Sequence, residues 1–269
     1  MTILVTGATG NIGRMVVDHL LTRGATDVRA LTNNPSKAAL PSGVEVVHGY
    51  LGKLDTLPAA FDGVDQLYLA PLLATADEAV QIAARAGVKH VVDVAGPPGN
   101  WWYPISEAIE RTGVEWTHLW PGEFMENAAI WADQIRGGTV REPYPTAANA
   151  PTAMDDIAAM AAAVLVDDDH RGKAYRLTGP QSLTRRERVR QIAIALDRHI
   201  DFQTVSLGEG IEVLQPSMGD HAQWYLEGLA SLVEHPEQPN TVFADVMGRE
   251  PTSFADWIAK NVALFHPKT

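Results

Sequence analysis

The chain has 269 residues, 46% of them hydrophobic and 20% charged, which is enough for one large domain, or for one and a half, with a sizeable core. Its net charge of −12 argues against a nucleic-acid surface, which needs clustered lysine and arginine, and against binding to an anionic membrane. Cysteine is absent from the sequence, so disulfide bonds, thiolate metal ligands and cysteine nucleophiles are excluded.

The first predicted strand, residues 3–5, runs into the glycine-rich turn TGATGNIG, which opens a predicted helix over residues 11–23. Free backbone N–H groups and the positive end of the helix dipole then face one point, which is a site for an anion. The spacing is G-x-x-G-x-x-G and no Gly-Lys-Ser/Thr follows, so we expect a dinucleotide there rather than a nucleoside triphosphate. The alternative is that the glycines serve backbone geometry alone. The cofactor-binding residues predicted in this turn are Gly7, Thr9, Gly10, Asn11, Ile12 and Gly13.

Further strands and helices alternate through the first half of the chain. Apolar strands are expected over residues 28–31, 44–47, 64–70, 90–94 and 116–119, with helices over residues 74–86 and 105–111. Short continuous apolar strands separated by helices are typical of a parallel sheet that helices cover on both faces. Together with the glycine turn, this order predicts an α/β fold with a Rossmann-like doubly wound parallel sheet.

The second half of the chain is less regular and is expected to form a small C-terminal α/β lobe on the substrate side. Helices are predicted over residues 154–166, 184–196, 220–234 and 253–263, and strands over residues 174–177 and 202–205. We expect an NAD(P)-binding domain over residues 1–128 and a smaller lobe, which does not fold independently, over residues 129–269. The strand at residues 174–178 is expected to join the sheet of the first domain.

Six segments follow one another along the chain: ILVTGATGNIGR, NNPSKAAL, GVEVVHG, AARAGVKHVV, GVEWTHLWPGEFMENA and GKAYRLTGPQSLT. In this order they resemble the NmrA-like branch of the atypical short-chain dehydrogenases/reductases. That branch includes quinone reductases, triphenylmethane-dye reductases and redox-sensing regulators. The resemblance covers nearly the whole chain and implies an NAD(P)-binding fold, but it does not name a substrate, because a fold does not fix a function.

The segment after the second strand bears on the choice between NADH and NADPH. An acidic residue there accepts from the ribose 2′-OH of NAD, whereas an arginine accommodates the 2′-phosphate of NADP. This chain has neither, because the segment is Thr32-Asn33-Asn34-Pro35-Ser36-Lys37. The resemblance implies an arginine in NADP-using relatives where this chain has Asn33. Thr32, Asn33 and Lys37 are the cofactor-binding residues predicted here. Thr32, Asn33 and Ser36 can hydrogen-bond to either cofactor, and Lys37 and Arg14 remain able to meet a phosphate, although a solvated loop lysine is the alternative for Lys37. We expect NADPH as the cofactor, with NADH left open.

Loops after three other strands are expected to line the cofactor, because ligands bind at the carboxyl ends of parallel strands. After the third strand the chain has Gly49-Tyr50 where relatives often carry Gly-Asp, and Tyr50 either packs on the adenine or only fills space. The other predicted cofactor-lining residues are Ala70, Pro71 and Leu72 after the fourth strand, and Ala95 and Gly96 after the fifth.

The usual catalytic dyad of short-chain enzymes, Tyr-x-x-x-Lys, is absent from the sequence. In that dyad the lysine activates the tyrosine for proton exchange during hydride transfer. Tyr103 lies in the right region but is followed by Glu107 instead of lysine. The histidines show no metal-binding spacing, and no G-x-S-x-G nucleophile motif is present, so neither a metal nor a serine nucleophile is expected. Quinones, enones and iminium ions need little protein acid when they accept a hydride, so the missing dyad is compatible with their reduction.

Aromatic side chains are concentrated after the fifth and sixth strands, where a substrate is expected to enter. Large planar side chains suit a flat conjugated substrate, although packing in the core or in a lid is the alternative. The predicted substrate-pocket residues are Trp101, Trp102, Trp120, Phe124 and Met125. Tyr103, His118 and Glu123 are the catalytic candidates, as polar contacts or proton relays. For His118, which lies within a predicted strand, the alternative is a buried and hydrogen-bonded core histidine.

These features predict an NAD(P)H-dependent reductase that transfers hydride to a planar conjugated small molecule such as a quinone, an enone or a polyketide-like aromatic. Two alternatives stay open. One is a non-catalytic NADP(H) redox sensor, suggested by the missing dyad, and the other is a non-redox isomerase or cyclase that uses Glu123 or Tyr103 as acid or base. Because neither a membrane-spanning run nor a targeting segment is apparent, we expect a cytoplasmic monomer or homodimer without nucleic-acid or membrane partners.

Overall fold

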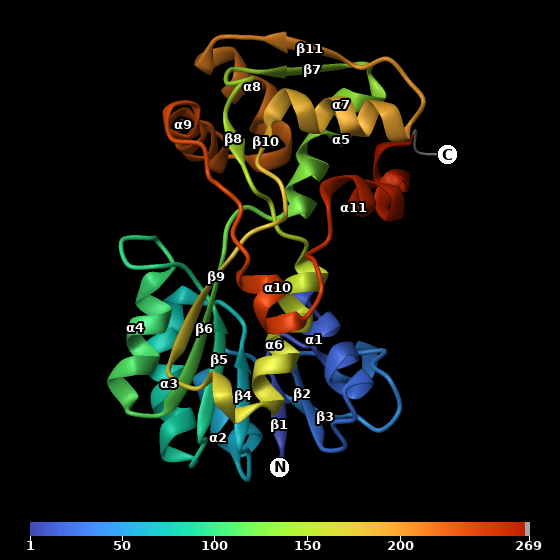
Figure 1. Cartoon of the computed structure of the whole chain (residues 1–269). Helices are drawn as coiled ribbons and strands as arrows, with labels where there is room; N and C mark the ends of the chain where they lie inside the picture. The colour runs from blue at the N-terminus through green and yellow to red at the C-terminus, as the bar shows by residue number, and fades with distance from the viewer. Residues whose placement is uncertain (267–269) are drawn as a thin grey trace. The chain divides into compact units, whose positions relative to one another are not determined.

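The computed structural model describes residues 1–266, and its largest element is a parallel β-sheet (Figure 1). Within this range seven strands pair in the order β3-β2-β1-β4-β5-β6-β9. They are β1 (Ile3–Val5), β2 (Val28–Thr32), β3 (Glu45–His48), β4 (Gln66–Leu69), β5 (His90–Val94), β6 (Glu115–Pro121) and β9 (Lys173–Leu177). Every pairing is parallel, and the strand order reverses direction between β1 and β4. The predicted doubly wound α/β fold is therefore confirmed, with its switch point between β1 and β4.

Helices cover both faces of this sheet (Figure 1). On one face α1 (Asn11–Thr22) packs against α6 (Met154–Val166), and on the other α3 (Ala76–Arg85) packs against α2 (Leu57–Phe61) and α4 (Tyr103–Thr112). α1 buries one stripe of its surface, whereas α6 is buried along nearly its whole length, which suits its run of alanine and aliphatic residues.

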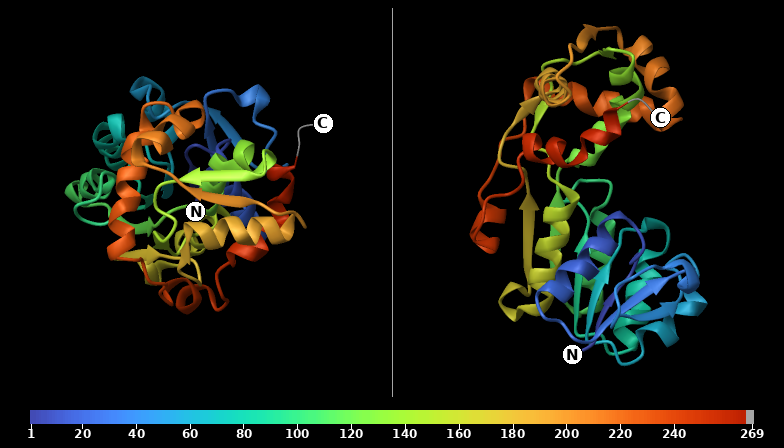
Figure 2. Two further views of the ribbon diagram at one scale, coloured as in Figure 1. Left: turned by 90° about the horizontal axis from the view of Figure 1, so that it is seen from above. Right: turned by 90° about the vertical axis from the view of Figure 1, so that its right-hand side faces the viewer.

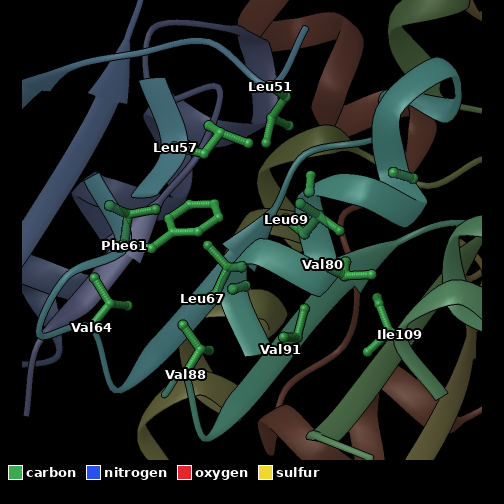
Figure 3. Packing of buried hydrophobic residues seen from close by; sticks show 14 of the residues in the cluster. Leu51, Leu57, Phe61, Val64, Leu67, Leu69, Val80, Val88, Val91 and Ile109 are labelled. Carbon is green, nitrogen blue, oxygen red and sulfur yellow. The ribbon is translucent and has the colours of Figure 1, made fainter. Parts of the chain in front are cut away.

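The core between the sheet and α2, α3 and α4 is aliphatic (Figure 3). Side chains from both layers interdigitate there, and each such burial contributes about 1.5–3 kcal/mol before conformational entropy is counted. The residues labelled in Figure 3 are Leu51, Leu57, Phe61, Val64, Leu67, Leu69, Val80, Val88, Val91 and Ile109. This packing makes the sheet a rigid support for the loops at the carboxyl ends of its strands.

The chain divides into two compact units, and the division differs from the predicted boundary at residues 128 and 129. The first unit contains Met1–Pro121 and Met154–Leu177, and the second contains Gly122–Ala153 and Thr178–Thr269. The segment Met154–Leu177 belongs with the sheet for two reasons. α6 packs on β4, β5 and β6, and β9 pairs with β6 from Thr117↔Lys173 to Pro121↔Leu177.

The second unit has two small sheets and several helices. In one sheet β7 (Thr139–Glu142) runs parallel to β11 (Asp201–Thr204), side by side in Figure 2, and in the other β8 (Ala148–Asn149) is antiparallel to β10 (Leu183–Thr184). The helices are α5 (Ala132–Arg136), α7 (Arg185–Ala195), α8 (Leu207–Met218), α9 (His221–Glu234), α10 (Val242–Met247) and α11 (Phe254–Asn261). The predicted capping box is present at Thr184 and Glu187, where it opens α7. Among residues 1–266, no helix is long and apolar enough to cross a membrane.

His90 forms a buried hydrogen-bonded cluster at the amino ends of the strands. Its Nδ1 lies 2.6 Å from Oε1 of Gln66, and its Nε2 lies 2.9 Å from Oγ1 of Thr117. Burial, assisted by the charge of Arg171, lowers the pKa of His90 from 6.5 to about 4. The native state therefore holds a neutral imidazole at neutral pH.

We expect His90 to make the protein less stable as the pH falls from about 6.5 to about 4. In this window the unfolded state binds a proton that the native state does not, so the free energy of unfolding falls by up to about 1.4 kcal/mol per pH unit. Denaturant titrations at several pH values measure this slope, which is expected to be smaller in His90→Gln. The control is His48→Gln, at an exposed position on β3. Equal slopes in all three proteins would contradict this role of His90.

Candidate cofactor and substrate site

The glycine turn between β1 and α1 is built by close backbone packing. Gly7 has φ +58°, in the left-handed region, and a Cβ there would lie 2.9 Å from Cβ of Ala70. The N–H of Gly10 donates to the carbonyl of Gly7 at 2.8 Å, which closes the turn. A Cβ on Gly13 would overlap with that same carbonyl, so only glycine lets α1 begin this close to β1.

The start of α1 leaves backbone donors open to a ligand. Gly10 is the N-cap residue and has no side chain with which to cap the helix. The first N–H groups of a helix have no partner within the helix, and the helix dipole adds partial positive charge there. The turn therefore fits the pyrophosphate of a dinucleotide, as the sequence predicts.

A cavity of about 380 Å³ opens beside this turn, within the first unit. Its walls come from the segments at the carboxyl ends of β1, β2, β3 and β4, on either side of the switch point. The lining residues are Gly7, Thr9, Leu31, Thr32, Asn33, Asn34, Gly49, Tyr50, Leu51, Ala70, Pro71 and Leu72. This is the position where open parallel sheets bind their ligands.

Seven of the predicted cofactor residues are brought together in this lining: Gly7, Thr9, Thr32, Asn33, Ala70, Pro71 and Leu72. The other seven lie outside it. Gly10, Asn11, Ile12 and Gly13 form the start of α1, and Ala95 and Gly96 follow β5. Lys37 is exposed at the end of the short helix η1 (Pro35–Lys37).

The wall after β2 is organised by neutral hydrogen bonds. The hydroxyl oxygens of Thr9 and Thr32 are 3.3 Å apart, and Thr32 Oγ1 also accepts from the N–H of Asn34 at 3.2 Å. The hydroxyl of Ser36 donates to Oδ1 of Asn34 at 2.9 Å. These bonds hold hydroxyl and amide groups at the part of the cavity where the adenosine ribose is expected.

Tyr50 presents an aromatic ring to the cavity and remains 45% exposed. Its N–H donates to Oγ1 of Thr56 at 3.1 Å, and its carbonyl accepts from the N–H of Lys53 at 2.8 Å. The ring lies against Gly52, where an added Cβ would come within 2.6 Å of it. The tight turn therefore fixes the ring in place without burying it.

The aromatic residues that follow β5 or lie on β6 differ in how much of each side chain is exposed. Trp101 and Trp102, just before α4, are 69% and 40% exposed, and Tyr103 is the half-buried first residue of α4. Trp120 on β6 is half-buried, and its indole N–H donates to the hydroxyl of Ser106 at 3.3 Å. Trp101 and Trp102 are therefore accessible to a ligand within the first unit, whereas the partly exposed Trp120 also packs against the core and stacks on His118.

His118 is fully buried, which removes it from the residues that we propose for substrate contact. Its Nδ1 lies 2.5 Å from Oδ1 of Asp93, and its ring stacks on Trp116 with centroids 4.0 Å apart. Ser106 donates to the other oxygen of Asp93 at 2.8 Å. This geometry matches the alternative interpretation of His118, a hydrogen-bonded core histidine.

Glu123 is held in an ion-pair cluster of the second unit, so its proposed acid–base role needs correction. Its carboxylate lies 2.8 Å from Arg188 Nη1 and 3.2 Å from Arg185 Nη1, and it accepts from Tyr225 at 2.8 Å and from Asn149 at 2.7 Å. Burial alone would raise the pKa of Glu123, but the two guanidinium groups outweigh it and lower the pKa to about 2. Such a carboxylate is a poor proton donor or relay near neutral pH.

Met125 is also structural, because it is 1% exposed in the core of the second unit. It packs in the same cluster as Trp131, Ile135 and Phe254. A large apolar side chain there fills core volume and is closed to a substrate. Phe124 precedes Met125 and is half-buried, in a bridge with Thr152.

The arginine cluster is the main feature that the sequence reasoning missed. Arg185 donates to the two carboxylate oxygens of Glu142, at 2.8 and 2.7 Å, in a fork-like pair that is almost fully buried. Arg185 and Arg188 are three residues apart on α7, on the side that also carries Val189 and Ile192. Residues three apart lie on the same face of a helix, and this face also carries apolar side chains. That pattern in the sequence indicates that both arginines face the interior.

Comparisons with known proteins agree with this architecture. A family model described as NAD(P)H-binding matches residues 7–99. The chain is 31% identical to a (4-alkanoyl-5-oxo-2,5-dihydrofuran-3-yl)methyl phosphate reductase of Streptomyces griseus, over 99% of this chain and 100% of that protein. It is 32% identical to an NAD(P)H azoreductase of Xenophilus azovorans, over 98% and 99% of the two chains.

Solved structures show the same fold. The triphenylmethane reductase of Citrobacter sp. complexed with NADP(H) has a TM-score of 0.86 at 22% identity, over 97% of this chain and 100% of that one. The NADPH-dependent quinone oxidoreductase of Escherichia coli complexed with NADPH has a TM-score of 0.87 at 22% identity, over 97% and 99%. With relatives above 30% identity over 98% or more of its length, the chain belongs to the NmrA-like branch of the atypical short-chain dehydrogenases/reductases.

Proposed function

We propose that the protein transfers a hydride from NADPH to a planar, conjugated small molecule in the cytoplasm. The observation that carries this proposal is the cavity beside the glycine turn, at the carboxyl ends of β1, β2, β3 and β4. It joins an open helix N-terminus, which suits a pyrophosphate, to walls of hydroxyl, amide and aromatic groups, which suit a nucleoside. The bound nicotinamide supplies the hydride.

A conjugated acceptor is supported by the reductions for which the relatives are named. The substrate of the first is an unsaturated lactone that carries an alkanoyl group and a methyl phosphate group, and the second reduces azo compounds. In both classes of substrate, the double bond that is reduced is conjugated with groups that withdraw or delocalise electrons. Hydride adds to one end of such a bond, the electron pair moves to the carbonyl oxygen or to the second nitrogen, and water supplies the proton.

The candidate acid–base groups fit an acceptor that needs little acid catalysis. His118 is buried against Asp93 and Glu123 is ion-paired with two arginines, so neither is poised to give a proton. Tyr103 stays as the candidate for a polar contact with the acceptor. We assign Trp101, Trp102 and Trp120 to contact with its planar face, because aromatic rings stack on conjugated systems.

A panel of acceptors tests this proposal. With NADPH as donor, we expect an acyl-substituted butenolide, a quinone and an azo dye to be reduced. One NADPH is expected to be oxidised for each butenolide C=C, for each quinone that becomes a hydroquinone, and for each azo bond that becomes a hydrazine. An unconjugated ketone is the control and is expected to react far more slowly, because no dyad protonates its developing alkoxide. Oxidation of NADPH by none of the conjugated acceptors, or equal rates with the ketone, would contradict the proposal.

A further inference from the structure

We propose that the cavity binds NADH and NADPH with similar affinity, an inference that rests on the proposed function. Among residues 1–266, those that line the cavity include none with a charged side chain. The polar groups on its walls are the hydroxyls of Thr9 and Thr32, the amides of Asn33 and Asn34, and the phenol of Tyr50. The two cofactors differ only at the ribose 2′ position, which is a hydroxyl in NADH and a phosphate in NADPH.

The nearby cations are not placed to read a phosphate in this cavity. Arg14 donates from Nη1 to the carbonyl of Ala39 at 2.7 Å, and its Nε lies 3.3 Å from Asp18. Both bonds hold the guanidinium against α1 and the loop after η1. Lys37 is exposed and stands outside the lining. A cation beside the 2′-phosphate, most often an arginine, is the group by which such sites favour NADPH.

The acidic group that would select NADH is also missing from the lining. A carboxylate after β2 would accept from the 2′-hydroxyl and would repel a 2′-phosphate. Asn33 and Asn34 occupy this segment, and an amide both donates and accepts. Neutral amides and hydroxyls therefore bond to a 2′-hydroxyl or to a 2′-phosphate without a large electrostatic preference.

The remaining contacts are to the adenine and the pyrophosphate, which NADH and NADPH have in common. The exposed ring of Tyr50, backed by Gly52, offers a flat face for adenine. The glycine turn offers backbone N–H groups for the pyrophosphate. Since these contacts are common to NADH and NADPH, they supply the same affinity to each.

Calorimetric titration of the apo protein with NADPH and NADH tests the inference without turnover. We expect both cofactors to bind, with dissociation constants within about tenfold of each other, and with a ratio that changes little with salt because no fixed ion pair is involved. Preference for one cofactor by about 100-fold or more would overturn the inference and leave the proposed function standing. Binding of neither cofactor would overturn both.

Four variants sharpen the test. Asn33→Arg is expected to raise the preference for NADPH at least about tenfold, and Asn33→Asp is expected to shift the preference toward NADH by a similar factor. Ala59→Arg, at an exposed position on α2, adds the same charge away from the cavity and is expected to leave the ratio unchanged. If Lys37→Ala weakened NADPH binding alone by tenfold or more, a lysine would be the phosphate reader and the inference would be wrong.

Discussion

Replacing Arg185 with alanine is expected to lower the free energy of unfolding by about 3–5 kcal/mol, because the change leaves buried carboxylates without their partner. Arg185 forms a fork-like pair with Glu142, whose side chain is 1% exposed, and it also contacts Glu123. Its guanidinium carbon lies 4.3 Å from the ring centroid of Trp131, so packing is lost as well. Chemical denaturation followed by tryptophan fluorescence measures the loss.

The matched control for Arg185 is Arg190→Ala, at an exposed position five residues further along α7. This variant removes the same charge from the same helix and is expected to change stability by less than about 0.5 kcal/mol. If the two variants had equal stability, the buried cluster would not stabilise the second unit in the way that its geometry indicates.

Changing Gly13 to alanine is expected to raise the dissociation constant for NADPH about 100-fold or more. The new Cβ overlaps with the carbonyl of Gly7, so α1 must move away from the turn and its N–H groups leave their positions. Each hydrogen bond to a charged group contributes about 1.5–3 kcal/mol, so the loss of two such bonds gives this factor. Calorimetric titration measures the change, and circular dichroism establishes that the variant is folded.

Gly228→Ala controls for the added methyl group. Gly228 lies inside α9, where an added Cβ would meet no atom within 4 Å, so this change is expected to leave NADPH binding unaltered. It also favours the helix, because alanine has a higher helix propensity than glycine. Unchanged NADPH affinity in a folded Gly13→Ala protein would mean that the turn does not hold the cofactor.

The first unit could be predicted closely because its signals are local. A continuous apolar run marks β1, shorter apolar stretches mark β2 and β5, and the predicted helix at 154–166 has the same bounds as α6. The cofactor loops follow from the strand order, since a parallel sheet brings the carboxyl ends of its strands to one edge. Asn34 was not predicted as a lining residue, because single positions within a loop depend on the turn geometry.

The roles of individual polar residues were harder to predict, because they depend on partners far along the chain. His118 meets Asp93, 25 residues away, and Glu123 meets Arg185, 62 residues away. Residue type and a place near the substrate loops made both look catalytic. Only the fold shows that His118 is buried against Asp93 and that Glu123 is buried between two arginines. Only the fold shows, too, that α6 returns to the first sheet after the chain has begun the second unit.

Hydride transfer is tested most directly with NADPH that carries deuterium on one face or the other of the nicotinamide C4, and an acyl-substituted butenolide as acceptor. Mass spectrometry of the product shows where the label goes. The proposal predicts a reduced lactone with one deuterium on carbon from one labelled face only, together with an equal amount of NADP⁺. No reduced product, or a product without deuterium from either labelled cofactor, would contradict it.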